Sequence, residues 1–442
     1  MNVLIIGASS SGKAAAILSK KLGNSTFVSE IQTADKFIDT IKEFDKYGIE
    51  YETEKNSLEN LKYCDLVITS PGVPREAPIL LEAGNMGIPI ISEIEFAYQH
   101  CNNPIIAITG TNGKTTTTAL IEHILLNAGV PAIAAGNIGK PFSEIIGEIS
   151  PETVIVLEIS SYQLDRIQKF HPQIAIITNI TPDHLHYHKT MEDYIAAKWK
   201  IASNQIPEDL LILNFEDSYL CKGNPNVKSR IEYFSIGDSN CKAFVRNGKI
   251  IIQQQKEEEL MEISELAIPG VHNIYNSLAA IIAANAIGIS NTLIRAGLMT
   301  FQGVNHRLEF VRDINGIQFI NDSKATNVNS TIYALDTFDK PIVWIAGGRG
   351  DNNDYSQLDS LVLSKVKKIV CIGEEAEAIS KHFCTMKPTI ICETMSEAIW
   401  EAYNSAESGD VVLFSPACKS FDMFMNFEHR GDVFKEIVNK LT

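Results

Sequence analysis

The clearest indication of the fold class is the stretch Pro104-Ile-Ile-Ala-Ile-Thr-Gly-Thr-Asn-Gly-Lys-Thr-Thr-Thr117. It begins with a short run of apolar, largely β-branched residues, which is the pattern of a strand buried on both faces. A turn with two glycines follows, and the threonines after it open a helical pattern. A buried strand, a glycine-rich turn and a helix in this order are typical of a parallel α/β sheet.

Similar apolar runs recur along almost the whole chain and alternate with longer helical patterns. Each run ends in or near Gly, Ser, Asn or Pro, which favours a turn at that point. Besides the run above, the buried parallel strands that we predict are VLIIG (3–7), DLVITSPG (65–72), IPIIS (88–92), TVIVLEISS (153–161), QIAIITNI (173–180), PIVWIAGG (341–348), KKIVCIG (367–373) and DVVLFSP (410–416). The sequence therefore predicts an α/β protein with mainly parallel sheets.

The length of 442 residues predicts about three domains. A short helix and a polar turn after IPIIS separate the first domain from the second, and the strand–helix alternation begins again after two helices near residue 300. We predict domains over 1–92, 93–303 and 304–442. Between about 225 and 265 the runs become shorter and more polar, which predicts an antiparallel insertion with a solvated edge.

The overall charge and the cysteines exclude several classes of protein. With 54 acidic against 38 basic residues the formal net charge is −16, which argues against binding to nucleic acid or to an anionic membrane. The eight cysteines are scattered without a C-x-x-C pair, so neither a disulfide framework nor a cysteine zinc site is expected. Neither a signal peptide nor an apolar run of about 20 residues is visible, and we expect a soluble, cytoplasmic protein.

Two glycine–lysine loops are candidates for binding phosphate. The first, Gly7 to Ala14, has both glycines of the pattern G-x-x-x-x-G-K-[ST], but Ala14 lacks the hydroxyl that would ligate magnesium. This loop is equally compatible with an ordinary turn and with a nonreactive phosphate site. Because G-x-G-x-x-G is absent, a nicotinamide cofactor is not favoured.

The second loop runs from Gly110 to Thr116. The position of the first glycine in the pattern holds Ile108, yet Gly113, Lys114 and the hydroxyl of Thr115 are kept. A lysine beside a metal-binding hydroxyl at a helix start suits a nucleotide whose terminal phosphate is transferred. We therefore predict ATP and Mg²⁺ at this second loop.

Magnesium requires hard oxygen ligands, and Glu158 ends one of the predicted buried strands. Considered alone, this carboxylate is equally compatible with a helix cap or a salt bridge. His184, His186 and His188 follow another strand, but their spacing in a turn is not H-E-x-x-H, so zinc is not expected. Lys198 has the local pattern of a solvated helix lysine.

Polar strings also lie near strand ends in the last third of the chain. Residues 321–327 directly follow the run GIQFI, where Asp322 or Ser323 could cap a helix or deliver polar groups into a cleft. The pair at 306–307 and the residues 415–420 also lie at or near the ends of predicted strands. The ligands of α/β sheets bind at the carboxyl ends of the strands.

The motifs GTNGKTTT, LEISSYQLD, TNITPDHL, AAK at Lys198 and PGVHNIYNSLAA resemble the Mur ligases of peptidoglycan synthesis, in the same order along essentially the whole chain. SPGVP (70–74), NHRLEF, INDSKATN and SPACKSFDMFMNFEHRG, with the short length, resemble the branch that couples D-glutamate to UDP-N-acetylmuramoyl-L-alanine. The resemblance implies a monomer with a Rossmann-like N-terminal domain for the UDP-sugar, a central P-loop ATPase-like domain and a Rossmann-like C-terminal domain for the amino acid.

The resemblance also implies roles for individual residues. ATP would be held by Gly110, Thr111, Asn112, Gly113, Lys114, Thr115, Thr116, Asn276, Arg307, Asp322 and Lys324. Two Mg²⁺ ions would be bound by Thr115, Glu158, His184 and a carbamylated Lys198. The catalytic residues would be Lys114, Glu158, His184 and Lys198. The UDP-sugar would meet Ser10, Ser11, Gly12, Ser70, Gly72 and Asn137, and D-glutamate would meet Thr326, Ser420 and Phe427.

The implied reaction is a two-step activation. Transfer of the γ-phosphoryl group of ATP turns the carboxylate into an acyl phosphate, and the amine of the amino acid then displaces phosphate through a tetrahedral intermediate. The chain departs from the family pattern at two places. The family usually has a lysine that binds the incoming amino acid, but this chain has Asp351 and Asn352 near that position, and Arg349 could substitute for the lysine. The family also has an arginine near the uridine nucleotide, which is missing here around residues 29–31.

Two other functions remain open from the sequence. A ligase of the same superfamily for another amino acid, or a folylpolyglutamate synthase, would share the ATP loop but not the SPGVP and C-terminal strings. A nucleotide-binding regulatory protein or a transporter ATPase would release ADP without a UDP-sugar and an amino acid.

Overall fold

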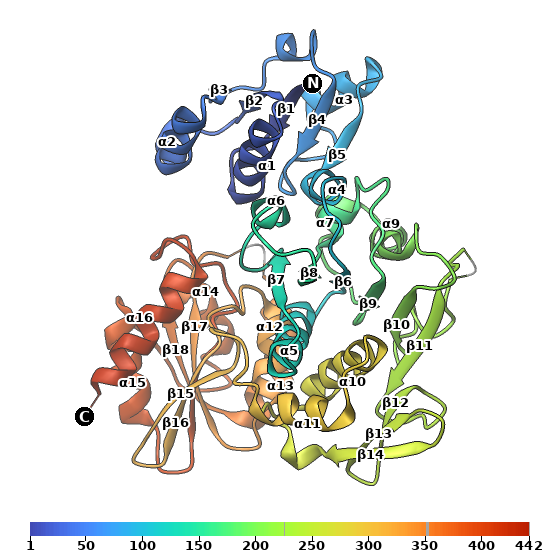
Figure 1. The fold of residues 1–442 in the computed structure, drawn as a ribbon. Helices are drawn as coiled ribbons and strands as arrows, with labels where there is room; N and C mark the ends of the chain where they lie inside the picture. Colours follow the sequence, from blue (N-terminus) through green and yellow to red (C-terminus); the bar gives the residue numbers. More distant parts are fainter. Residues whose placement is uncertain (225, 351–352, 442) are drawn as a thin grey trace. The chain divides into compact units, whose positions relative to one another are not determined.

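The computed structural model describes residues 1–224, 226–350 and 353–441, apart from the side chain of His186. The chain divides into two compact units. The first consists of Met1–Ala267 with Asn273–Phe301, and the second consists of Ile268–His272 with Gln302–Thr442. The first unit contains two sheets and the second contains one (Figure 1).

The first sheet has five parallel strands in the order β3-β2-β1-β4-β5. These strands are β1 (Asn2–Ile6), β2 (Ser25–Ser29), β3 (Glu50–Glu52), β4 (Leu66–Thr69) and β5 (Ile90–Ser92). The helices that belong to this part are α1 (Ser10–Lys21), α2 (Ile38–Tyr47) and α3 (Pro78–Asn85). Separate apolar clusters contain Ile5 and Leu4, because successive side chains of a strand point to opposite faces.

The second sheet is parallel from β7 to β12, in the order β14-β13-β12-β11-β10-β9-β6-β8-β7. Its strands are β6 (Ile105–Thr109), β7 (Ala132–Gly136), β8 (Val154–Glu158), β9 (Ile174–Ile177), β10 (Leu210–Asn214), β11 (Arg230–Ser235), β12 (Ala243–Arg246), β13 (Lys249–Gln253) and β14 (Glu257–Glu262). Every residue of β6, β8 and β9 is buried, as the apolar runs predict. β10 is buried throughout as well, although it was not among the predicted strands.

The prediction of an antiparallel insertion between about 225 and 265 is only half right. β13 and β14 are antiparallel, and their acidic end is exposed. β11 and β12 instead continue the parallel sheet beside β10. Their outer faces are partly exposed, so an alternating pattern here reflects an uncovered sheet face and not a change of strand direction.

Helices complete the first unit around these two sheets. They are α4 (Glu93–Tyr98), α5 (Lys114–Asn127), α6 (Phe142–Ile145), α7 (Ser161–Leu164), α8 (Leu185–His188), α9 (Met191–Trp199), α10 (Val271–Ala286) and α11 (Asn291–Thr300). α5 packs against β7 and β8 and against α11. In the described part of the chain, no helix combines the length and the apolar character needed to span a membrane.

The second unit has a six-stranded sheet in the order β15-β16-β20-β17-β18-β19, and only β15 is antiparallel to its neighbour. The strands are β15 (Glu309–Ile314), β16 (Ile317–Asn321), β17 (Ile342–Gly347), β18 (Val366–Ile372), β19 (Thr389–Ile391) and β20 (Val411–Phe414). The helices are α12 (Val328–Asp336), α13 (Asp359–Lys365), α14 (Ala376–Phe383), α15 (Met395–Ser405) and α16 (Phe427–Lys440). Apolar clusters lie on both faces of this sheet, as a doubly covered α/β sheet requires.

The predicted fold class is confirmed, and so are the predicted parallel strands. Two of the strands that were not predicted, β3 and β19, are short and lie at sheet edges. An edge strand has one uncovered side, and its sequence therefore lacks the continuous apolar run.

One buried carboxyl group in the first unit has a consequence for stability. Glu93 opens α4, is 1 % exposed and accepts a hydrogen bond of 2.6 Å from the backbone N–H of Ser143. Burial raises the pKa of Glu93 to about 7 from its ordinary value of 4.5. Since the folded pKa lies above the unfolded value, folding becomes less favourable as the pH rises from about 4.5 to about 7.

We expect Glu93→Gln to stabilise the protein relative to wild type at pH 8 but not at pH 5, because it removes a charge that is costly to bury. The difference between the two pH values should reach up to about 3 kcal/mol. Thermal unfolding of both proteins at the two pH values measures it. Glu95→Gln is the matched control: Glu95 accepts backbone N–H groups of Gln168, Lys169 and Phe170, so this variant should be destabilised at both values. An equal effect of Glu93→Gln at pH 5 and pH 8 would contradict the assignment.

Candidate active site

The loop between β6 and α5 can be formed only by glycines at two positions. Gly110 has φ of 145°, and a Cβ atom there would lie 1.9 Å from the Thr178 hydroxyl. Gly113 has φ of 82°, and a Cβ atom there would lie 2.3 Å from the Asn276 side-chain oxygen. The loop therefore brings its backbone close to β9 and α10 and leaves the N–H groups at the start of α5 directed at its open end.

Lys114 is the first residue of α5 and folds back over this loop. Its Nζ donates hydrogen bonds to the carbonyl oxygens of Gly110, at 3.0 Å, and Thr111, at 2.7 Å. Thr115 and Thr116 follow in the first helical turn and are buried. Helix N–H groups, a lysine and hydroxyl groups at one loop form a site for a phosphate chain.

The loop is fixed by the carboxyl end of the neighbouring strand β9. The backbone N–H of Asn112 donates to Asn179 Oδ1 at 2.9 Å, and the Thr178 hydroxyl donates to the Asn112 carbonyl at 2.6 Å. The Thr111 hydroxyl lies 3.0 Å from the Tyr194 hydroxyl of α9. These contacts hold the loop in one conformation before any ligand binds.

Asn276 of α10 is also part of this region. Its Oδ1 accepts a hydrogen bond of 3.2 Å from the Thr117 hydroxyl, and its Nδ2 donates to Asn273 at 3.1 Å. Asn276, which the resemblance assigns to ATP, lies against the glycine loop and the start of α5.

Glu158 ends β8, next to β6 in the sheet, and is 2 % exposed. The Asn137 amide donates a hydrogen bond of 2.9 Å to Glu158 Oε1, so two predicted site residues meet here. The strand stops because Ser160 and Gln163 form a capping box at the start of α7. A buried carboxylate beside the phosphate loop is a suitable ligand for a divalent cation.

His184 stands just after β9 with φ of 54°, a strained backbone for a residue other than glycine. Its ring lies 4.9 Å from the ring of Tyr162 and its Nε2 lies 3.4 Å from Asp183 Oδ2. His188 is fully buried and lies 2.9 Å from the Ser161 hydroxyl, while the side chain of His186 lies outside the described part. Burial lowers the pKa of His188 to about 4.

Within the residues that the structure describes, no group of three His, Cys, Asp or Glu side chains could hold a metal ion alone. The donors that the resemblance implies are the Thr115 hydroxyl in the first turn of α5, the Glu158 carboxylate at the end of β8 and the His184 imidazole after β9. This mixed set, together with the glycine cradle, fits a magnesium ion that is completed by phosphate oxygens of a nucleotide.

Lys198 is buried, so the interpretation of a solvated helix lysine is wrong. α9 turns this side chain inward, where its Nζ donates a hydrogen bond of 2.6 Å to the Gly110 carbonyl and lies 4.5 Å from the centre of the Tyr194 ring. Burial, and next the charge of Lys114, lower the pKa of Lys198 well below its ordinary value. This environment favours the neutral form of the amine over the ammonium.

The first glycine loop meets the SPGVP segment. A Cβ atom at Gly12 would lie 1.9 Å from the Gly7 carbonyl oxygen, and the Ser70 hydroxyl donates to the same carbonyl at 3.3 Å. Ser10 and Ser11 open α1, and Gly72 is exposed with open space around it. The predicted residues of the UDP-sugar site thus lie after the carboxyl ends of β1 and β4, except for Asn137, which follows β7.

In the second unit, the interpretation of Asp322 or Ser323 as a helix cap is wrong. α12 is capped by Asn327, whereas Asp322 is buried and accepts hydrogen bonds from the Ser415 hydroxyl at 2.8 Å and the Leu308 N–H at 3.2 Å. Burial raises the pKa of Asp322 to about 7, although the charge of Arg307 opposes this rise.

The buried guanidinium of Arg430 joins the polar strings of the second unit. It donates to the Ser323 hydroxyl at 3.0 Å, the Ser323 carbonyl at 2.8 Å and the Cys418 carbonyl at 3.1 Å. The Ser323 hydroxyl donates in turn to the Phe427 carbonyl at 2.8 Å, and Lys324 Nζ lies 5.5 Å from the Phe427 ring centre. This arrangement connects the predicted ATP residue Lys324 with the predicted amino-acid residue Phe427.

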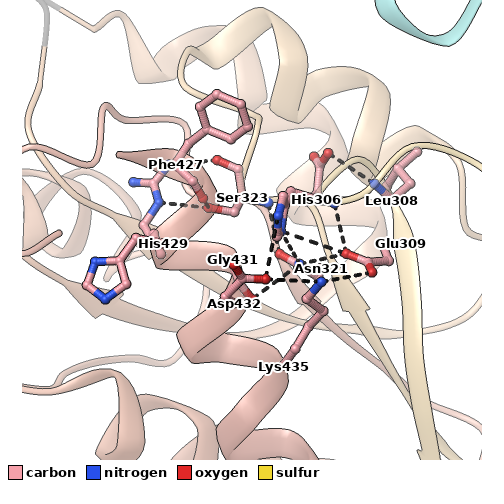
Figure 2. A network of polar contacts seen from close by, with 12 residues as sticks. His306, Leu308, Glu309, Asn321, Ser323, Phe427, His429, Gly431, Asp432 and Lys435 are labelled. Carbon is pink, nitrogen blue, oxygen red and sulfur yellow. Dashed lines mark hydrogen bonds and ion pairs between the residues drawn. The ribbon is translucent and has the colours of Figure 1, made fainter. Parts of the chain in front are cut away.

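A second cluster of polar side chains, around His306, holds the loop before β15. Figure 2 shows His306 between Asn321, Glu309 and Asp432. The Asn321 amide lies 3.0 Å from His306 Nδ1, and a Cβ atom at Gly431 would lie 2.1 Å from that same nitrogen. The cluster therefore fixes the chain directly before Arg307.

The amino-acid residues are less completely defined. Thr326 is half-buried in the loop after β16, and Ser420 is buried in the loop after β20. Arg349, the proposed substitute for a lysine, forms two hydrogen bonds with exposed Glu374, of 3.0 and 2.7 Å. Asp351 and Asn352 lie outside the described residues.

Two residues of these sites, Tyr194 and Arg430, were not predicted from the sequence. Tyr194 contacts both Thr111 and Lys198, and its position four residues before Lys198 on α9 was the available signal. Arg430 lies inside FEHRG, where nothing local distinguishes it from a solvated helix arginine.

Comparison with known proteins identifies the family. Residues 108–284 match the Mur ligase middle domain, and residues 306–418 match the Mur ligase glutamate ligase domain. The UDP-N-acetylmuramoylalanine–D-glutamate ligases of Christiangramia forsetii and Salinibacter ruber are 43 % and 42 % identical to this chain. The first alignment covers 99 % of both proteins, and the second covers 99 % of this chain and 97 % of the relative.

Solved structures share the fold at lower identity. The UDP-N-acetylmuramate–alanine ligase of Thermotoga maritima has a TM-score of 0.63 at 21 % identity, with 99 % of each chain covered. MurF of Acinetobacter baumannii has a TM-score of 0.62 at 20 % identity, with 94 % of this chain and 91 % of that chain covered. With relatives above 40 % identity over nearly its whole length and two matching domains, this chain belongs to the Mur ligase family.

Proposed function

We propose that this protein is an ATP-dependent ligase that joins D-glutamate to UDP-N-acetylmuramoyl-L-alanine in the synthesis of peptidoglycan precursors. Full-length relatives that carry this activity in their names support the substrates. One observation at the site carries the chemistry: Lys114 and Lys198 both donate hydrogen bonds to the Gly110 carbonyl, at 3.0 and 2.6 Å. Two ammonium groups on one carbonyl repel each other, and the site therefore favours anionic partners.

The first partner is the phosphate chain of ATP at the glycine loop. N–H groups at the start of α5 bind it, and Lys114 stabilises the charge that spreads over the γ-phosphoryl group during transfer. Mg²⁺, held by Thr115, Glu158 and His184, would supply further charge neutralisation when bound. Asn276 orients the loop, and we propose that Arg307, Asp322 and Lys324 contact the nucleotide as well.

The second partner is a carboxylate built on Lys198 itself. The lone pair of neutral Lys198 Nζ attacks the carbon of CO₂, a C–N bond forms as one C=O π bond breaks and its electron pair moves to oxygen, and the nitrogen then loses one proton, so that the side chain becomes an anionic carbamate. A carbamate here replaces the repulsion between two cations with an attraction to Lys114 and adds an oxygen ligand for a second Mg²⁺. The side chain of Lys198 is already directed at the loop, and its lowered pKa provides the neutral amine.

The remaining assignments follow the three proposed domains. In 1–92, Ser10, Ser11, Gly12, Ser70 and Gly72 bind the UDP-sugar, with Asn137 from the central domain, 93–303. In 304–442, Thr326, Ser420 and Phe427 bind D-glutamate. The substrate carboxylate takes the γ-phosphoryl group, and the amine of D-glutamate then displaces phosphate. Because ATP and a nucleotide sugar are its substrates, we propose a cytoplasmic enzyme that acts as a monomer.

We expect phosphate release only when ATP, UDP-N-acetylmuramoyl-L-alanine and D-glutamate are all present. Phosphate release is measured with the complete mixture, with each substrate omitted, and with a panel of D- and L-amino acids. Strong release with a different amino acid would indicate another ligase of the superfamily. ATP hydrolysis that needs neither the UDP-sugar nor an amino acid would indicate a regulatory or transport ATPase and overturn the proposal.

We expect Lys114→Ala to reduce kcat at least about 100-fold, because the lysine stabilises charge that develops only in the transition state. The fold should be retained, as circular dichroism would show. Lys249→Ala is the control, because Lys249 is paired with Glu259 at 2.8 Å on the outer hairpin. A folded Lys114→Ala protein with wild-type turnover would remove Lys114 from the mechanism.

We expect ¹³C-bicarbonate to give a carbamate carbon signal in wild-type protein that is absent from Lys198→Ala. Activity should be lost in Lys198→Ala and partly restored by formate or acetate, which fill the vacated anion site. Lys198→Arg should stay inactive, because arginine keeps a positive charge where a negative one is needed. Full activity of Lys198→Arg, or a wild-type signal identical to that of Lys198→Ala, would refute the carbamate.

A further inference from the structure

A bidentate ion pair joins the two sheets of the first unit. Arg75 directly follows the SPGVP segment after β4, and Asp165 directly follows α7 after β8. Arg75 Nε donates to Asp165 Oδ2 at 2.7 Å, and its Nη2 donates to Oδ1 at 2.6 Å. Two parallel charged hydrogen bonds fix both distance and orientation, which a single contact does not.

The surroundings of this pair are built to keep it in place. Lys200 Nζ donates to the Asp165 backbone carbonyl at 2.6 Å and lies 3.3 Å from Oδ1. The Arg75 guanidinium lies 5.0 Å from the Tyr187 ring centre, and its Nη2 lies 3.4 Å from His188 Nδ1. Burial would raise the pKa of Asp165, but the hydrogen bonds from Arg75 and the charge of Lys200 lower it below its ordinary value.

The pair connects two parts of the candidate active site. On one side, Arg75 is three residues after Gly72 and five after Ser70. On the other side, the Tyr187 ring lies 4.4 Å from the ring of Tyr162, which lies 4.9 Å from the ring of His184. A small pocket lies at this junction, and Ser70, Val73, Tyr162, Gln163 and Tyr187 are among its lining residues.

The pair is not needed to form either sheet. The first sheet has an apolar cluster on each face, and the second sheet has an apolar cluster of its own. A separate anchor already ties α4 to the chain after Asp165, because the Glu95 carboxylate accepts three backbone N–H groups at 168–170. What the ion pair adds is the position of the SPGVP segment relative to the turn that carries His184.

We propose that Arg75 and Asp165 are positioning residues that hold the SPGVP segment in register with the phosphate loop, so that the carboxylate of the bound UDP-sugar meets the γ-phosphate of ATP. The inference rests on the proposed function, because it assigns the substrate carboxylate to this junction. Neither residue touches the reacting atoms. Loss of the pair should therefore leave the binding of nucleotide unchanged and impair the alignment of the UDP-sugar.

The test compares Arg75→Met, which keeps the length of the side chain but not the charge, with Arg75→Lys, Asp165→Asn and the double variant. Glu76→Gln is the matched control. Glu76 belongs to the same segment and pairs with Lys189 at 3.6 Å, but both side chains are more than half exposed and such a pair contributes little. Steady-state kinetics with UDP-N-acetylmuramoyl-L-alanine and with ATP are measured for each variant.

We expect Arg75→Met to raise KM for the UDP-sugar about tenfold, which is a loss of about 1.4 kcal/mol, and to lower kcat, with little change in KM for ATP. Arg75→Lys should be intermediate, because an ammonium cannot form the two parallel hydrogen bonds. The double variant should be no worse than Asp165→Asn, because the two side chains act through one contact. Equal KM values in Arg75→Met and Glu76→Gln, or additive losses in the double variant, would overturn the proposal.

A second measurement needs no substrate and separates this proposal from the proposed function. Amide hydrogen exchange followed by mass spectrometry should be faster in Arg75→Met for peptides that cover 69–77 and 160–168, and unchanged in Glu76→Gln. Wild-type protein that is inactive with the three substrates would refute the proposed function alone. Unchanged exchange in Arg75→Met would refute the positioning pair even in an active enzyme.

Discussion

The carbonyl oxygen of Gly110 accepts hydrogen bonds from two lysine ammonium groups, and the rest of the candidate active site depends on this shared acceptor. Lys114 comes from the start of α5 and Lys198 from α9, so the two helices are fixed against the same loop. Lys198 is buried and Lys114 is partly buried, and two positive charges at one carbonyl repel each other unless anions lie beside them. We propose that the phosphate chain of ATP beside Lys114 and a carbamate on Lys198 supply these anions.

The second unit also contains a buried cation, the guanidinium of Arg430. Arg430 donates to the chain after β16 and to the chain after β20, and it thereby brings the residues around Ser323 and Cys418 together. Its burial lowers its pKa to about 10, which still leaves it charged near neutral pH. A permanently charged group with several donors suits this role, because its hydrogen bonds do not depend on pH in the physiological range.

Much of the fold and part of the site could be predicted from the sequence. Strands buried on both faces are apolar at nearly every position, so runs such as PIIAITG and PIVWIAGG could be predicted as strands from the sequence alone. The pattern of the second glycine loop indicated a phosphate site at Lys114, whereas Glu158 and His184 were grouped with it through the resemblance to the Mur ligases. The edge strands β3 and β19 and the direction of β11 and β12 were not predictable, since partly covered strands carry a weak apolar signal.

The sequence by itself thus determined the α/β class, the parallel strands and the phosphate loop, because these depend on local spacing and on which residue types can be buried. Three contacts became visible only in the tertiary structure: the hydrogen bond from buried Lys198 to Gly110, the hydrogen bond from Ser415 to Asp322, and the ion pair of Arg75 with Asp165. The physical reason is the same in all three cases. The environment of a charged side chain is set by residues far away in the chain, here 88, 93 and 90 positions apart, and no local pattern contains it.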